Sequence, residues 1–236
     1  MSKSLNNNFI KLDKDMITEY SGKEILVLWY IHNHYVSINN QCSFYLKDLI
    51  STCTYSPHYN KTNKEFIEVL NKLQEQNIIS IDQDIHNKKL IILRYKYDDK
   101  NKTYFNNIRN FVLCYSDEVE RILFAKENND IQCKVDILLQ VFYYLKSFTY
   151  EINNLRYCYP SISRIAKDLK ISRTTVQKSI DDLTNLNLIF KYNFKAYYDK
   201  NNTKYIVPNI YAFEPYDDRK LQIDYALRQK NFKCWC

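Results

Sequence analysis

The chain has 236 residues, of which 45% are hydrophobic and 26% are charged, and its formal net charge is +7; this balance is typical of a folded protein with one large or two small domains. Gly22 is the only glycine, and the loops that cradle nucleotide phosphates need several, so we expect no nucleotide partner. No apolar run approaches the ~18 residues of a membrane span and Met1–Asn8 is polar, so we expect a soluble, cytoplasmic protein without a membrane partner.

The first hundred residues contain three periodic apolar segments followed by two short strand-like ones. The periodic segments, Lys23–His34, Phe44–Cys53 and Asn63–Gln76, predict helices. Ile78–Ile81 and Leu90–Tyr95 are rich in isoleucine and predict a β-hairpin.

Residues 99–131 predict an ordered connector. Tyr104–Tyr115 is apolar enough to pack against a core. Ser116 is placed to cap a short helix that ends near Phe124, because acidic residues follow it in the first turn.

The second half of the chain holds the most informative pattern. Lys134–Tyr150 has the dense apolar periodicity of a buried supporting helix. Ser161 is then the predicted N-cap of a short helix, Lys170–Ile171 is a tight connection, and Ser172 is the N-cap of a second helix. Two short helices that meet across a tight turn predict a helix-turn-helix.

The second of these helices has one apolar and one polar side. Val176, Ile180, Leu183 and Leu186 or Leu188 form the inward stripe. The outward side carries residue types that read bases, because arginine bonds guanine bidentately, glutamine bonds adenine, and threonine contacts a thymine methyl or a phosphate. The predicted DNA-binding residues of the motif are Ser161, Ser172, Arg173, Thr174, Thr175, Gln177 and Lys178.

After Asn187 the pattern changes from helical to alternating. Leu188–Tyr192 predicts one strand, and Lys204–Val207 through Ile210–Phe213 predicts its partner. The loop between them is a wing whose basic side chains suit the phosphate backbone or the minor groove. The predicted DNA-binding residues of the wing are Lys191, Lys195, Lys200 and Lys204.

Positive charge is concentrated in residues 156–204, which carry ten basic and four acidic residues, whereas the rest of the chain carries 24 basic and 23 acidic residues. Such a concentration is the electrostatic footprint expected of a DNA-binding surface. A solvated basic face is the alternative interpretation.

The first hundred residues repeat the order of helices and wing. Leu70–Ile79 corresponds to Ile180–Ile189, which indicates an internal duplication. The first copy has a longer turn, Thr54–Thr62, and nearly balanced charge, with 13 basic against 12 acidic residues over positions 1–100. Two roles remain open for this first copy, namely contact with DNA and dimerisation. Its candidate DNA-binding residues are Tyr59, Asn60, Lys61 and Lys64, with His58 beside them.

The run Tyr159–Val176 resembles the helix-turn-helix of many bacterial regulators and of replication initiators from plasmids and phages. Asn209–Ala212 is similar to the wing end of tandem winged-helix proteins from low-GC Gram-positive mobile elements. The resemblance implies a mainly α fold with small β-hairpin wings (α+β) and two winged helix-turn-helix domains in tandem. We therefore predict an N-terminal winged-helix-like domain, an ordered connector, a C-terminal DNA-binding domain and a helical tail, at 1–98, 99–131, 132–214 and 215–236.

No motif for catalysis, metal or cofactor binding is present in the sequence. The seven cysteines are scattered without a CxxC pair, so we interpret them as reduced thiols and expect no metal site. No GxSxG elbow, HExxH motif or carboxylate cluster occurs, so we expect no enzymatic activity and no cofactor.

Three functions remain open. The first is binding to a replication origin or an operator, by a single chain or by a homodimer. The second is transcriptional control, as a repressor or activator that a partner regulates. Both functions predict salt-dependent, sequence-selective binding of double-stranded DNA. The third function is a protein-interaction module, which predicts no selective duplex binding.

Overall fold

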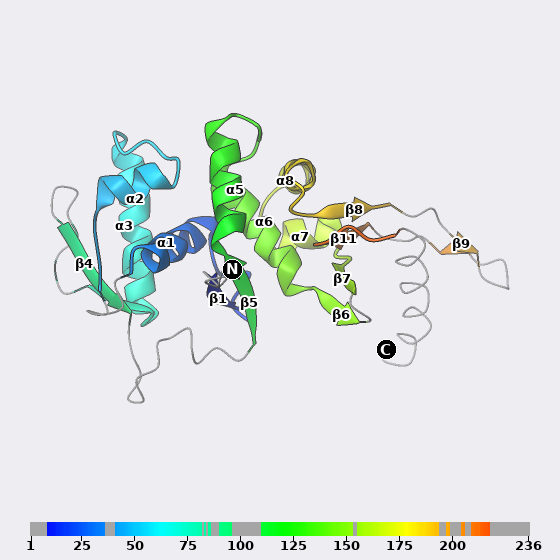
Figure 1. Cartoon of the computed structure of the whole chain (residues 1–236), viewed down its shortest axis with the longest axis horizontal. Coiled ribbons are helices and arrows are strands. Elements are labelled where there is room, and N and C mark those ends of the chain that lie inside the picture. Colours follow the sequence, from blue (N-terminus) through cyan, green and yellow to red (C-terminus); the bar gives the residue numbers. More distant parts are fainter. Residues whose placement is uncertain are drawn as a thin grey trace, which may run out of the picture. The chain divides into compact units, whose positions relative to one another are not determined.

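The computed structural model describes residues 9–35, 41–81, 83, 85, 90–95, 110–152, 155–193, 197–198, 204–205 and 209–217. The chain divides into two compact units, Met1–Tyr143 and Tyr144–Cys236. The boundary falls inside helix α6 (Val135–Ser147), which therefore contributes residues to both units (Figure 1).

Three helices carry much of the core of the first unit. In α1 (Gly22–Asn33) every residue from Glu24 to Ile31 is buried. α2 (Leu46–Thr52) and α3 (Asn60–Glu75) each bury one face. The buried residues of α3 recur at the spacing of a single helix face, because 3.6 residues make one turn. They are Phe66, Val69, Leu70 and Leu73.

A three-stranded antiparallel sheet completes this helical group. Its strands are β2 (Cys42–Tyr45), β3 (Ile79–Ile81) and β4 (Leu90–Tyr95), in the order β2-β4-β3. Burial alternates along β2, where Cys42 and Phe44 are buried. One face of the sheet therefore lies against the core, as is usual for small antiparallel sheets.

A second sheet joins distant parts of the first unit. β1 (Phe9–Asp13) pairs antiparallel with β5 (Phe111–Tyr115), and Leu12 lies opposite Val112 with both side chains buried. α5 (Ser116–Glu127) follows β5 directly. The described part of the predicted connector therefore packs within the first unit.

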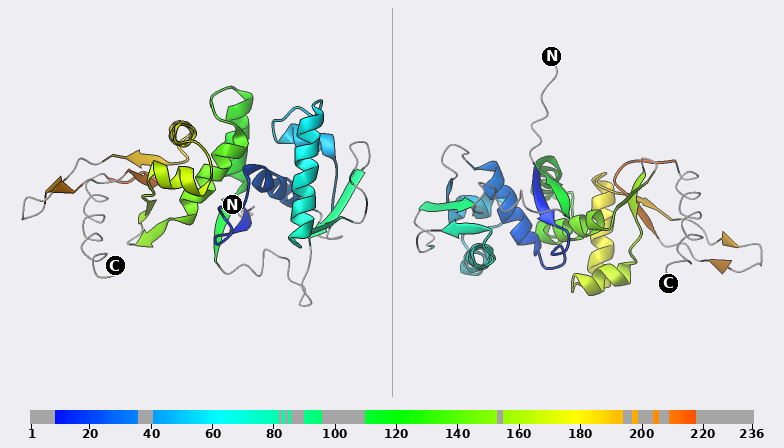
Figure 2. Two further views of the ribbon diagram at one scale, coloured as in Figure 1. Left: turned by 180° about the vertical axis from the view of Figure 1, so that it is seen from behind. Right: turned by 90° about the horizontal axis from the view of Figure 1, so that it is seen from below.

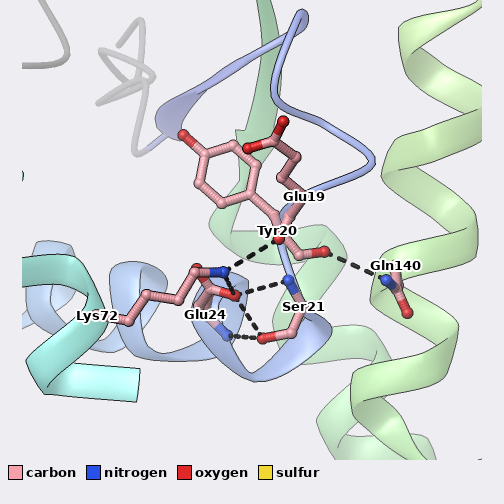
Figure 3. A network of polar contacts seen from close by, with 6 residues as sticks. All are labelled: Glu19, Tyr20, Ser21, Glu24, Lys72 and Gln140. Carbon is pink, nitrogen blue, oxygen red and sulfur yellow. Dashed lines mark hydrogen bonds and ion pairs between the residues drawn. The ribbon is translucent and has the colours of Figure 1, made fainter. Parts of the chain in front are cut away.

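A buried carboxylate holds the N-terminus of α1 (Figure 3). Glu24 N donates to Ser21 Oγ at 3.2 Å and Ser21 N donates to Glu24 Oε2 at 2.9 Å, which closes a capping box. Lys72 Nζ of α3 lies 2.9 Å from the Glu24 carboxylate, and Glu24 is only 1% exposed. Gln140 Nε2 of α6 donates to the Tyr20 carbonyl at 3.3 Å. These bonds tie α1 to α3 and α6.

Packing requires a glycine at position 22. A Cβ atom there would lie 1.7 Å from the carbonyl oxygen of Asp136 in the first turn of α6. No side chain fits at that distance, so any other residue would push α1 away from α6. The single glycine of the chain thus permits a close approach of two helices.

The second unit combines two short helices with a four-stranded antiparallel sheet. β6 (Tyr150–Ile152) and β7 (Leu155–Cys158) form a hairpin ahead of α7 (Ile162–Asp168) and α8 (Arg173–Asn185). The predicted α+β class, mainly helical with small antiparallel sheets, is confirmed.

The last strands of the second unit close the sheet and begin a wing. β8 (Phe190–Tyr192) and β11 (Ile210–Ala212) complete the order β6-β7-β11-β8. β9 (Tyr197–Tyr198) and β10 (Lys204–Tyr205) pair separately. A cluster centred on Tyr157, Ile210 and Ala212 is buried beneath partly exposed aromatic side chains, which are Tyr159, Phe190, Tyr192 and Tyr216.

Two predicted helices were too long, because each ran into a strand. The segment Phe44–Cys53 begins in β2, and its helix starts only at Leu46. Lys134–Tyr150 ends as a helix at Ser147, and Tyr150 opens β6. β2 pairs with β4, which is remote in the sequence, and β6 pairs with β7 in a short hairpin. Neither kind of pairing leaves a clear pattern in the local sequence.

Other predicted bounds also change: α3 begins at Asn60 rather than Asn63, and α5 ends at Glu127 rather than near Phe124. Leu188 and Ile189 lie in the turn after α8, and the strand begins at Phe190. The partner segment divides, because β10 pairs with β9 whereas β11 pairs with β8. Tyr115 has the extended backbone of the N-cap of α5, so Ser116 is already the first helical residue. The predicted C-terminal helical tail lies almost wholly outside the described residues.

Asparagine takes the place of glycine where helices end. Asn77, Asn129 and Asn187 have φ angles of 58°, 60° and 52°. The left-handed backbone region is costly for most residues, but asparagine tolerates it better than the others. In the described part of the chain, Thr54 and Lys170 are the remaining non-glycine residues with positive φ, at 65° and 55°.

Candidate nucleic-acid interface

Both helices of the predicted motif begin at serine caps. Ser161 Oγ accepts a hydrogen bond of 3.2 Å from Arg164 N, and Ser172 Oγ accepts one of 3.0 Å from Thr175 N. These bonds satisfy amide groups that have no partner inside a helix. The two predicted N-caps are therefore confirmed.

The turn between α7 and α8 is tight. Lys170 takes the left-handed conformation, and Ile171 N donates to the Ala166 carbonyl at 3.1 Å, which ends α7 in a Schellman-type cap. In the left view of Figure 2, α8 is seen end-on and α7 lengthwise, so the two helices cross steeply. This arrangement is a helix-turn-helix.

A polar contact anchors α7 to the end of α6. Tyr144 Oη donates to Asp168 Oδ2 at 2.6 Å, and burial together with this hydrogen bond raises the pKa of the Tyr144 hydroxyl. Arg164 Nε lies 3.6 Å from the same Asp168 oxygen, and its guanidinium stacks 4.8 Å from the centre of the Phe148 ring. α7, the first helix of the motif, is thus held against the C-terminal end of α6.

α8 presents a polar face opposite its buried one. Val176, Ile180 and Leu183 are fully buried, as the apolar stripe predicts. The other side contains Arg173, Thr174 and Lys178, which are exposed, and Thr175 and Gln177, which are partly exposed.

The Ser172 and Thr175 hydroxyls lie 2.7 Å apart and take part in the helix cap. The Ser161 hydroxyl likewise takes part in a helix cap. The predicted contact of these three residues with DNA stays a prediction. The exposed side chains Arg173, Thr174 and Lys178 lie in the first two turns of α8, where recognition helices read bases.

Asp181 connects α8 to the first strand of the wing. Gln177 Nε2 donates to Asp181 Oδ1 at 2.9 Å, and Lys191 Nζ of β8 lies 3.7 Å from that oxygen. The acidic group therefore orients two residues that the sequence predicts to contact DNA, and it lowers the positive charge beside them.

Several cations near the motif are already neutralised. Arg156 forms an ion pair with Glu214, which lowers the pKa of the Glu214 carboxyl through a hydrogen bond. Arg164 and Lys191 face Asp168 and Asp181.

Four other basic residues of the motif are exposed and form no ion pair within the described residues: Lys167, Lys170, Arg173 and Lys178. Sequence reasoning counted Lys167 and Lys170 in the local charge but missed them as site residues. Their exposure beside the turn, which is not evident from the sequence, is what identifies them.

The structure describes two of the four predicted wing residues, Lys191 and Lys204. Lys191 is half-buried against Asp181, and Lys204 belongs to β10. Lys195 and Lys200 lie outside the described residues, so their predicted contact with DNA stays a prediction.

The candidate residues of the first unit gather at the start of α3. Tyr59 is its N-cap and is 67% exposed. Asn60, Lys61 and Lys64 are exposed in the first turns of the helix. The structure brings these four together, but they belong to a different unit from α8.

The described residues contain no group of three or more His, Cys, Asp or Glu side chains that could hold a metal ion. The five described cysteines are buried free thiols, and burial raises the pKa of the Cys42 thiol to about 12. Among the described helices, none combines the length and apolarity that a bilayer crossing requires.

Comparison with known families agrees with the geometry of the second unit. A family model described as a helix-turn-helix domain matches residues 141–189, a range that begins in α6 and contains both α7 and α8. A search of curated proteins finds no match to the chain. The second unit thus holds a helix-turn-helix domain of the kind found in DNA-binding winged-helix proteins.

Proposed function

We propose that the protein binds double-stranded DNA sequence-specifically and reads the major groove with the first two turns of α8. The observation that carries this proposal is the exposed polar face of α8, on which Arg173, Thr174 and Lys178 follow directly after the Ser172 cap. Arginine and threonine match base edges, and the lysine matches phosphate or guanine. The helix-turn-helix match to this region supports the proposal.

We further infer that two winged helices stand in tandem. In the second unit, β7 before α7 pairs with β11, which also pairs with β8 after α8. In the first unit, β2 before α2 pairs with β4, which also pairs with β3 after α3. This shared strand order supports an internal duplication.

The ends of corresponding helices support the same inference. Asn77 after α3 and Asn187 after α8 both have positive φ, and the amides that follow donate to Leu73 and Leu183 carbonyls, each at 3.0 Å. Thr54 after α2 and Lys170 after α7 likewise both have positive φ. The longer turn of the first copy, residues 53–59, is where the two units differ.

For the biological role we propose origin binding in replication initiation of the plasmid or phage type, with no catalytic activity of its own. Two base-reading units, or four in a homodimer, would read successive segments of the major groove. The resemblance of the helix-turn-helix run to replication initiators favours this role. Transcriptional regulation is the alternative, and the position of the cognate site, at an origin or at a promoter, distinguishes the two.

Selection of bound duplexes from a random pool at physiological salt tests the proposal. The wild type is compared with Arg173→Ala and Lys178→Ala, and with Asn185→Ala as a control at the exposed far end of the same helix. We expect an enriched motif that weakens with the first two variants only. A pool without enrichment, or enrichment indifferent to those two variants, would favour a protein-interaction module instead.

A further inference from the structure

The first unit contains a cavity lined by lysines, which we call the lysine pocket. Its volume is about 370 Å³, and it is lined by residues of α1, α3, α5 and the start of α6, with the loop after α2. Four lysines reach it from these elements: Lys23, Lys61, Lys126 and Lys134. None of them belongs to the helix-turn-helix of the second unit.

The positive charge of the lysine pocket is only partly balanced. Lys23 Nζ lies 2.6 Å from Glu65 Oε2 and 3.8 Å from Asp136 Oδ2, so two carboxylates surround this one ammonium group. Lys61, Lys126 and Lys134 form no ion pair within the described part of the chain. The lining thus contains four lysines and one carboxylate, that of Glu65, and even with the Asp136 carboxylate beside Lys23 counted, two positive charges remain unbalanced.

The excess charge acts on the acidic group inside the pocket. The hydrogen bond from Lys23 lowers the pKa of the Glu65 carboxyl, and the charges of Lys61 and Lys134 lower it further. Like charges that converge on a recess repel one another unless an anion lies between them. An anionic ligand would therefore be stabilised in this pocket without any rearrangement of charge.

The other groups in the lining favour a phosphate over a carboxylate ligand. Thr54 and Thr62 add hydroxyl groups, and lysines that arrive from several elements can surround a tetrahedral anion. Lys61 and Thr62 also lie in the first turn of α3, where the partial positive charge of the helix adds to theirs. Val135 and Tyr55 contribute apolar surface beside these polar groups.

We propose that the lysine pocket binds a phosphate group, as a second anion site separate from α8. A volume of about 370 Å³ exceeds what one phosphate fills and is within the roughly 300–1,000 Å³ of small-molecule sites. The phosphate therefore belongs either to a small phosphorylated compound or to the backbone of bound DNA next to α3. Both sources offer the same chemistry, and the experiment below separates them.

The test uses the full-length protein with Lys126→Gln and Lys134→Gln, singly and together, and Lys47→Gln as a control. Lys47 is exposed on α2 and does not line the pocket. Pyrophosphate is titrated calorimetrically in chloride buffer at constant ionic strength. The affinity for a random-sequence duplex is measured in parallel at several salt concentrations. Thermal unfolding of every variant establishes that it is folded, and the single variants replace the double variant should that one unfold.

We expect saturable pyrophosphate binding that weakens at least tenfold in the double variant and is unchanged in Lys47→Gln. If the phosphate is that of DNA, the slope of log affinity against log salt also falls by about 1 in the double variant, because one phosphate contact is lost. If the ligand is a small molecule, the slope matches that of the control. Pyrophosphate binding that is absent or equal in all variants, with an unchanged slope, would overturn the proposal. The pyrophosphate titration does not involve α8, so it reports on the lysine pocket even if base reading by α8 fails.

Discussion

Within α8, the side-chain amide of Gln177 donates a hydrogen bond of 2.9 Å to the carboxylate of Asp181. The same carboxylate faces Lys191 of the neighbouring strand at 3.7 Å. An acidic residue on a surface proposed to bind DNA opposes the phosphates, but it also fixes the orientation of a side chain able to pair with adenine. Charge and orientation are therefore separable properties of Asp181.

Two substitutions separate them. Asp181→Asn keeps an acceptor for Gln177 and removes the charge, so affinity for any duplex should rise about threefold to tenfold at low salt with an unchanged site preference. Asp181→Ala removes both properties and should raise affinity equally while relaxing preference at one base pair. Binding of cognate and scrambled duplexes by fluorescence anisotropy measures both effects. Equal selectivity of the two variants would show that the hydrogen bond has no role in base reading.

Lys170 combines backbone strain with a cation at the turn. Its φ of 55° is unfavourable for a residue with a Cβ atom, so Lys170→Gly should raise the free energy of unfolding by about 1 kcal/mol. Lys170→Gln keeps the strain and removes the charge. If the ammonium group contacts a phosphate, both variants should reduce the salt slope of duplex binding by about 1.

Urea unfolding and salt-dependent binding measure the two properties of Lys170 independently. A glycine variant no more stable than the glutamine variant would contradict the assignment of strain. Unchanged salt slopes in both variants would remove Lys170 from the interface.

The buried carboxylate of Glu24 depends on Lys72. Glu24 is 1% exposed and its charge is balanced by the ammonium group 2.9 Å away. Lys72→Met should therefore cost about 3 kcal/mol of unfolding free energy, because it leaves a buried charge without its partner. Lys64→Met, at an exposed position of the same helix, is the control and should change stability by less than about 0.5 kcal/mol.

Adding Glu24→Gln to Lys72→Met should recover part of the loss, since no unpaired charge then remains. The double-mutant cycle from chemical unfolding gives the interaction energy of the pair. A cost for Lys72→Met no larger than that for Lys64→Met would refute a stabilising role.

Gly22→Ala tests the close approach of α1 and α6. The added Cβ would lie 1.7 Å from the Asp136 carbonyl, so the helices must separate, at an expected cost of about 3 kcal/mol. Lys47→Ala, in the exposed first turn of α2, controls for the effect of alanine at a helix start. Thermal unfolding compares the two, and similar midpoints would argue against this packing constraint.

Local chemistry explains what the sequence predicted well. The caps of α7 and α8 were predictable because Ser161 and Ser172 bond to amides only three residues away. The inward stripe of α8 followed from helical periodicity, and its members Val176, Ile180 and Leu183 are fully buried.

Features that depend on distant partners were not predictable. β2 and β7 are strands because they pair with β4 and β11, which lie roughly fifty residues further along the chain. The contact of Gly22 with Asp136 and the ion pair of Lys72 with Glu24 likewise join segments remote in sequence. The lysine pocket was not predictable for the same reason, since its lysines are spread from position 23 to position 134 and form no local motif.

The central claim is that α8 reads base pairs, and the affinity of Arg173→Ala for the selected duplex tests it most directly. The measurement compares this variant with Asn185→Ala on the selected duplex and on a scrambled one of equal length. A bidentate contact to guanine is worth ~1–3 kcal/mol, so we predict a loss of roughly tenfold to a hundredfold on the selected duplex and a much smaller loss on the scrambled one. An equal loss on both duplexes, or none, would contradict base reading by α8.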